Sequence, residues 1–186
     1  MQTSPPGLPP VEQSDPSLAG GKAIAPPASP ASHKLIAFPV GSLRLAVAMN
    51  SISRVINRPK VYSSGLNAVG ITTVGNRELT IVDLHQQLFG TAQAYSPERP
   101  GYLVLTPAPS GELMGIPTAE TPLLLEVDSS QIRELPESYR QADTLWVASH
   151  IVRINSGEDG ALQSLFLLDM AAVMARLMNQ DRGGRG

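Results

Sequence analysis

The three histidines are the side chains of this chain most suited to acid–base chemistry or metal binding. His33 follows a proline-rich stretch, His85 lies one residue inside a short predicted helix, and His150 lies in an apolar, strand-like stretch. No two of them are four residues apart, the spacing that places two histidines on one helix face to bind a metal. We therefore interpret His85 as an exposed, solvated side chain and His150 as a structural one.

Covalent catalysis has as little support in the sequence. Cysteine is absent, which excludes disulfides, thiolate metal sites and a cysteine nucleophile. No serine lies in a Gly-x-Ser-x-Gly turn, and no glycine-rich phosphate-binding motif occurs. Glu158 and Asp159, the closest pair of carboxylates, lie between glycines in a turn-like stretch, where solvated charges are expected. The sequence therefore predicts a binding protein that is not an enzyme and holds no metal or cofactor.

Two aspartates, Asp83 and Asp169, are the remaining candidates for general bases. Each follows an apolar, strand-like run and precedes a predicted helix, the second of which begins at Met170. A carboxylate at this position accepts hydrogen bonds from the unpaired amides of the first helical turn. We expect capping rather than catalysis, and we expect Gly90 to end the first helix in a left-handed conformation.

The elements that position these residues are mostly strands. Apolar and polar residues alternate from Leu43 to Met49 with the period of a half-buried strand. Pro39 should lie at a sheet edge or bulge, because it lacks an amide donor. Further strands are predicted at 34–40, 69–74, 78–82, 102–106, 112–116, 123–127, 146–155 and 161–168, with a turn at Gly75–Asn76. About ten short strands and two short helices predict an all-β protein of barrel type.

The last predicted helix carries an apolar stripe at helical spacing. Core packing is the commoner role of such a stripe, and a methionine-rich face is also suited to adaptable binding. The stripe consists of Met170, Val173, Met174, Leu177 and Met178.

Composition separates the ends of the chain from its centre. Eight of the 17 prolines fall within the first 32 of 186 residues, and such a segment buries too little apolar surface to fold. We expect residues 1–32 to be a disordered tail, either a spacer or a ligand for a proline-binding groove, and residues 179–186 to be flexible. The tail does not read as a signal peptide, and no apolar run approaches the roughly 18 residues that span a membrane. A net charge of −2 without a basic run does not favour nucleic-acid binding.

The stretch from Gly70 to Asp83 resembles the hallmark of the CheW family of bacterial chemotaxis adaptors. In that family the stretch begins with Gly-Val, passes through an Asn-Leu-Arg-Gly turn, and ends in Pro, two apolar residues and Asp-Leu-Arg. The turn differs here, since residues 73–76 read Thr-Val-Gly-Asn, and Thr80 and His85 replace the proline and the final arginine. The fourteen-residue spacing is kept, and the positions that fit are Gly70, Ile71, Ile81, Val82, Asp83 and Leu84.

The resemblance covers about residues 34–178 and implies both a fold and a function. The implied fold is two SH3-like five-stranded β-barrels, at about residues 34–90 and 101–165, in a CheW-like domain of residues 33–178 that ends in a helix at 169–178. The implied function is that of a non-enzymatic, cytoplasmic adaptor. Its implied partners are the regulatory domain of a CheA-type histidine kinase and the tip of a methyl-accepting chemotaxis receptor, in a system that serves chemotaxis, phototaxis or pilus-driven motility.

The resemblance also implies which residues bind partners. Arg54 stands where the family has a glutamate, Gly75 stands where it has an arginine, and an acidic residue of the second barrel is missing. Because a mispaired buried charge costs several kcal/mol, these changes predict a divergent set of partners or a scaffold that has lost receptor coupling. A small-molecule binding β-barrel is the third interpretation, which a pocket with convergent polar groups would support. The implied partner-binding residues are Ile52, Arg54, Val55, Gly75, Gly115, Thr121 and Leu124.

Overall fold

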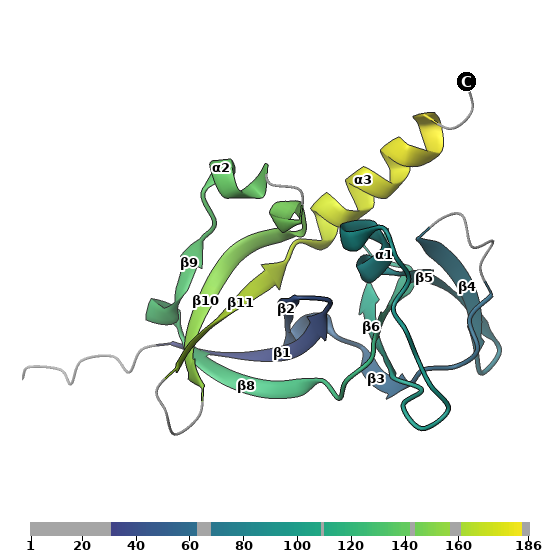
Figure 1. Cartoon of the computed structure of the whole chain (residues 1–186), viewed down its shortest axis with the longest axis horizontal. Coiled ribbons are helices and arrows are strands. Elements are labelled where there is room, and N and C mark those ends of the chain that lie inside the picture. Colours follow the sequence, from purple (N-terminus) through teal and green to yellow (C-terminus); the bar gives the residue numbers. More distant parts are fainter. Residues whose placement is uncertain (1–30, 63–67, 109, 142–143, 157–160, 184–186) are drawn as a thin grey trace, which may run out of the picture.

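The fold is all-β, with two sheets, short helices and one longer helix near the C-terminus (Figure 1). It is seen in a computed structural model that describes residues 31–62, 68–108, 110–141, 144–156 and 161–183. The strands are β1 (Ser32–Val40), β2 (Leu43–Ala48), β3 (Arg54–Asn57), β4 (Val69–Val74), β5 (Arg77–Val82), β6 (Tyr102–Pro107), β7 (Leu113–Thr118), β8 (Leu123–Asp128), β9 (Ile132–Glu134), β10 (Ala148–Ser156) and β11 (Ala161–Leu168). The α-helices are α1 (Leu84–Phe89), α2 (Glu137–Arg140) and α3 (Met170–Gly183). The predicted fold class is confirmed, and no helix of the described ranges is long and apolar enough to cross a membrane.

Each of the two sheets combines strands that lie far apart in the sequence. The six-stranded sheet has the order β8-β1-β2-β11-β10-β9, and the five-stranded sheet has the order β3-β6-β7-β5-β4. Two parallel pairs, β2–β11 and β5–β7, lie among antiparallel neighbours. The predicted barrel ranges, 34–90 and 101–165, therefore do not match the sheets, because these parallel pairs join segments far apart in the chain.

Three apolar cores are found among the described residues, and they hold the sheets together. One lies within the six-stranded sheet and includes Leu35 and Val152, and another lies within the five-stranded sheet and includes Leu79 and Leu105. A larger central core, which includes Phe38, takes side chains from both sheets, α1 and α3. Because successive side chains of a strand point to opposite faces, strands such as β1 and β6 contribute to two cores at once. The two sheets therefore pack as one body around the central core.

The apolar stripe of α3 is mostly a packing surface. Val173 and Leu177 are buried in the central core, and Met170 and Met174 pack against it. Met178, by contrast, is 54% exposed. The helix continues to Gly183, five residues beyond its predicted end at residue 178.

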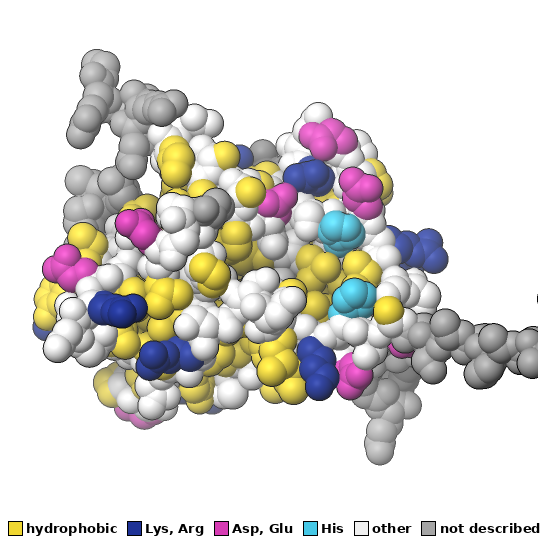
Figure 2. Space-filling model, turned by 180° about the vertical axis from the view of Figure 1, so that it is seen from behind, with side chains coloured by type: hydrophobic (Ala, Val, Ile, Leu, Met, Phe, Trp, Pro, Cys, Tyr) yellow, Lys and Arg dark blue, Asp and Glu magenta, His cyan; other side chains and the backbone are white. Residues whose placement is uncertain are grey.

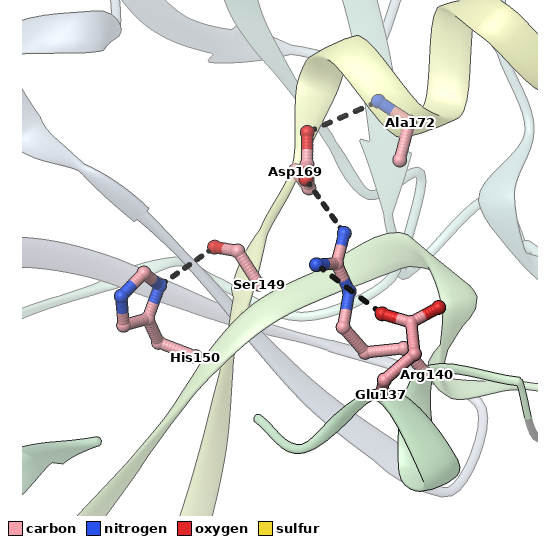
Figure 3. A network of polar contacts seen from close by, with 6 residues as sticks. All are labelled: Glu137, Arg140, Ser149, His150, Asp169 and Ala172. Atoms are coloured by element: carbon pink, nitrogen blue, oxygen red, sulfur yellow. Dashed lines mark hydrogen bonds and ion pairs between the residues drawn. The ribbon is translucent and has the colours of Figure 1, made fainter. Parts of the chain in front are cut away.

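Both predicted helix caps are present. The Asp83 carboxylate accepts a hydrogen bond from the Gln86 amide at 3.0 Å, and Gly90 ends α1 in the left-handed region with φ of 71°. Asp169 likewise accepts from the Ala172 amide at 3.0 Å (Figure 3). The two aspartates thus serve as structural caps, as expected.

The folded part begins slightly earlier than predicted. β1 starts at Ser32, and the carbonyl of Ala31 accepts from both the amide and the hydroxyl of Ser129. Ser32, which was predicted to belong to the tail of residues 1–32, is therefore part of β1. The pairing of β1 with β8 ends at Ala37, so Pro39 has no partner on β8. The predicted edge position of Pro39 is therefore confirmed.

Candidate functional site

The fold brings several of the predicted partner-binding residues to two edge strands. β3 is an outer strand of the five-stranded sheet, and β8 is an outer strand of the six-stranded sheet. Arg54 and Val55 lie on β3, and Leu124 lies on β8. Asn57, at the end of β3, and Leu123, at the start of β8, line the same hollow. We call β3, β8 and the hollow between them the β3–β8 surface.

The hollow between the two edge strands has a volume of about 530 Å³. Thr121 lies in it and donates a hydrogen bond through Oγ1 to the Tyr102 hydroxyl at 3.1 Å. Leu123 and Leu124 occupy opposite faces of β8, yet they are 53% and 57% exposed. An edge strand with exposed apolar side chains has an unpaired backbone and a hydrophobic surface, which together are suited to binding another protein.

A second hollow, of about 560 Å³, contains two arginines and an apolar floor. Arg54 and Arg77 lie at it together with Gly75 of the β4–β5 turn, and Leu79 and Leu105 line it from the core of the five-stranded sheet. Neither arginine has a carboxylate within salt-bridge distance among the described residues. We call this feature the arginine hollow. Its cationic side chains leave it suited to an acidic group with an apolar neighbour.

Two predicted partner-binding residues are part of the interior instead. Ile52 is half-buried and packs against the central core. Gly115 is buried on β7, and an added Cβ would lie 2.6 Å from Ile81 Cδ1 and 2.8 Å from Leu103 Cδ1. Gly115 is therefore required for close packing and offers no side chain to a partner.

Two residues at the candidate binding surfaces, one at the arginine hollow and one on β8, were not predicted from the sequence. Arg77 directly follows the β4–β5 turn and lies at the arginine hollow, and Leu123 is as exposed as the predicted Leu124. The run Leu123–Leu125 carried a signal, because it lacks the polar alternation of a half-exposed strand. Arg77 had no comparable signal, since arginines after turns are usually solvated.

The histidines have structural contacts. His33 Nε2 lies 2.9 Å from the Ser129 hydroxyl, and His150 Nδ1 lies 2.9 Å from that of Ser149. His85 donates from Nδ1 to the Thr91 carbonyl at 2.6 Å, and it is half-buried rather than exposed as predicted. Within the described residues no group of three or more His, Asp or Glu side chains could hold a metal ion.

Charged side chains of both signs lie on the face shown in Figure 2. On the face shown in Figure 2, hydrophobic side chains gather toward the middle, with basic and acidic side chains around them. This mixture differs from the basic stripe of a nucleic-acid-binding protein.

Comparison with known proteins places these features in a family context. Residues 34–178 match the family model of the CheW-like domain. Among solved structures, the scaffolding protein TtCheW from Thermoanaerobacter tengcongensis has a similar fold, with a TM-score of 0.61 and 10% sequence identity over 78% of this chain and 90% of that chain. No curated protein sequence matches this chain.

Proposed function

The chain belongs to the CheW-like domain family, and from this premise we propose that it is a non-enzymatic scaffold in a chemotaxis-like signalling system. The family match spans residues 34–178 and so includes nearly all of the described strands. Exposed apolar side chains on edge strands of the described residues support a binding role. The finer proposal is a cytoplasmic adaptor that connects a receptor to a CheA-type histidine kinase.

The observation that carries this proposal is the β3–β8 surface. Val55 is 38% exposed on β3, and Leu123 and Leu124 are more than half exposed on β8. Exposed apolar groups on neighbouring edge strands commonly mark a protein–protein interface. We propose that the regulatory domain of the kinase binds here.

The arginine hollow supports a further part of the proposal, which concerns the receptor. Arg54 replaces the acidic residue of the family, and Gly75 replaces its arginine. A partner of this chain should therefore present an acidic residue to the hollow, because a matched charge steers association and a mismatched one is repelled. Conventional chemotaxis receptors are then poor partners, and a dedicated receptor of a phototaxis or pilus-driven system is a better one.

A second candidate function is a scaffold that has lost receptor coupling. The missing family charges at Gly75 and Ala119 favour it, since both positions now lack a charged side chain. Kinase binding without receptor binding would identify this case.

Binding assays with the kinase regulatory domain and receptor-tip fragments test both candidates. Wild type should bind the kinase domain. Arg77→Glu, at the arginine hollow but on neither β3 nor β8, should change receptor preference while kinase affinity is unchanged. Binding to neither partner would contradict the adaptor function. The variant Ile52→Asp is unsuitable for this purpose, because Ile52 packs against the central core and a buried carboxylate would destabilise the fold.

A further inference from the structure

The arginine hollow carries positive charge that the described part of the chain does not neutralise. Arg54 and Arg77 are both exposed, and no acidic residue is among the residues that line the hollow. Neither arginine forms a salt bridge with a carboxylate of the described residues. Because both side chains are exposed, an acidic segment can reach them from solvent without any opening of the fold.

The two arginines are placed to meet two carboxylates at once. Arg54 lies on β3 and Arg77 on β5, and β6 and β7 separate these strands in the sheet. Neighbouring strands are about 4.8 Å apart, so the two backbones are about 14 Å apart, and the long side chains can narrow this gap. Two carboxylates about 10 Å apart are therefore able to meet one arginine each. Val74 and Leu113, which are half-buried at the same hollow, offer apolar contact to residues beside the carboxylates.

A pair of acidic residues with this spacing occurs near the N-terminus. The acidic residues of the stretch 1–30 are Glu12 and Asp15, and in an extended chain two residues three positions apart lie about 10 Å apart. Apolar side chains, Val11 and Leu18, flank them. We call the stretch from Val11 to Leu18 the acidic segment. It matches the arginine hollow in charge, in spacing and in having apolar neighbours.

The chain between the acidic segment and the domain is long enough for this contact. Ala31 is fixed to the six-stranded sheet, because its carbonyl accepts from the Ser129 amide. Asp15 precedes Ala31 by 16 positions, which span up to about 50 Å. A compact domain of about 150 residues is about 40 Å across. The acidic segment can therefore reach the hollow, and such a tether gives an effective concentration in the millimolar range.

We propose that the acidic segment binds the arginine hollow of its own chain, with Glu12 and Asp15 each paired with one of Arg54 and Arg77. Exposed ion pairs contribute little each, so the segment exchanges between the bound and the free form. A partner that offers an acidic residue to the hollow then competes with the segment. This consequence rests on the proposed function, whereas the contact within the chain does not.

A spin label on the acidic segment detects the contact in the full-length chain. The chain lacks cysteine, so Ser14→Cys carries a nitroxide at a single site. In NMR spectra the label should weaken the amide signals of Gly75, Asn76 and Arg77, while the signals of β9 persist. Raising the salt concentration from about 0.1 M to about 1 M shortens the Debye length from about 10 Å to about 3 Å and should restore the weakened signals.

Charge-removing substitutions of similar size identify the contacting side chains. Glu12→Gln together with Asp15→Asn should abolish the signal loss at the hollow. Arg54→Gln together with Arg77→Gln should do the same. Arg133→Gln is the matched control, because Arg133 is an exposed arginine on β9 and does not line the hollow, and it should leave the signal loss unchanged.

Three results would overturn the proposal. The label has no effect at the hollow, or weakens the signals of β9 equally. The signal loss survives both pairs of charge-removing substitutions. The loss occurs when the label and the observed amides are on different molecules, which would make a second copy the source of the bound segment. Because the free chain is measured, none of these results decides whether the protein binds a kinase or a receptor, which the binding assays above test separately.

Discussion

The caps of α1 and α3 differ by one ion pair, and this difference predicts unequal losses of stability. Asp83 and Asp169 each accept from a helix amide at 3.0 Å. Asp169 also accepts from Arg140 Nη2 through its second oxygen at 3.3 Å (Figure 3). The Arg140 and Asp169 side chains are only 29% and 23% exposed, so water screens this pair less than a typical surface pair.

The expected magnitudes follow from these contacts. Removing a cap costs about 1 kcal/mol, so Asp83→Ala should lower the free energy of unfolding by about that amount. Asp169→Ala removes the cap and the ion pair, and the pair adds about 1 kcal/mol, the upper end for exposed pairs. We expect a total loss of about 2 kcal/mol for Asp169→Ala. Asparagine caps as well as aspartate, so Asp169→Asn should lose only the contribution of the ion pair.

Urea unfolding of these variants and of Arg140→Ala measures the free energies directly. A double-mutant cycle between Asp169→Asn and Arg140→Ala should give a coupling energy of about 1 kcal/mol. Equal losses for Asp83→Ala and Asp169→Ala, together with no coupling to Arg140, would refute this reasoning. Glu137 is not expected to replace the pair, because it lies 4.0 Å from Arg140 and its side chain is 72% exposed.

Three further predictions follow from the fold. Gly115→Ala should lower the free energy of unfolding by about 1–3 kcal/mol, because the new Cβ would lie 2.6 Å from Ile81 Cδ1. Urea unfolding measures this loss, and an unchanged free energy would show that the neighbouring side chains move to make room for the methyl group. Removing residues 1–30 should leave the melting temperature nearly unchanged, whereas removing 1–32 deletes the first β1 contacts and should lower it by about 2–4 °C; equal melting temperatures would contradict the observed start of β1. Burial raises the pKa of Tyr95 from 10.0 to about 12, so the unfolded chain loses this proton first and stability should fall as pH rises between these values. Tyr95→Phe should show a smaller fall in unfolding experiments across the same pH range, and an identical fall would exclude Tyr95 as its source.

Local features of the fold could be predicted from the sequence. The caps at Asp83 and Asp169 and the left-handed Gly90 depend on residues within a few positions of each other. The Gly75 turn is also local, and its φ of 62° agrees with the predicted hairpin. Such features follow from backbone geometry and side-chain reach alone.

Long-range pairings could not be predicted in the same way. The parallel pair β2–β11 joins strands from opposite ends of the domain, and no periodicity within either strand encodes it. The ion pair of Arg140 with Asp169 spans 29 positions. Pattern alignment alone could not distinguish Gly115, which is buried, from Leu124, which is exposed, because burial depends on which strands cover each face.

The measurement that tests the central claim most directly is calorimetric titration of a CheA-type kinase regulatory domain with wild type and two matched variants. Leu124→Asp places a charge on the β3–β8 surface. Leu162→Asp places the same charge on β11, which β1 and β2 separate from β8 in the sheet, at a leucine that is 69% exposed. The scaffold function predicts that wild type and Leu162→Asp bind equally well and that folded Leu124→Asp loses binding. Equal binding by all three proteins would contradict the proposed surface, and no binding by wild type would contradict the adaptor function itself.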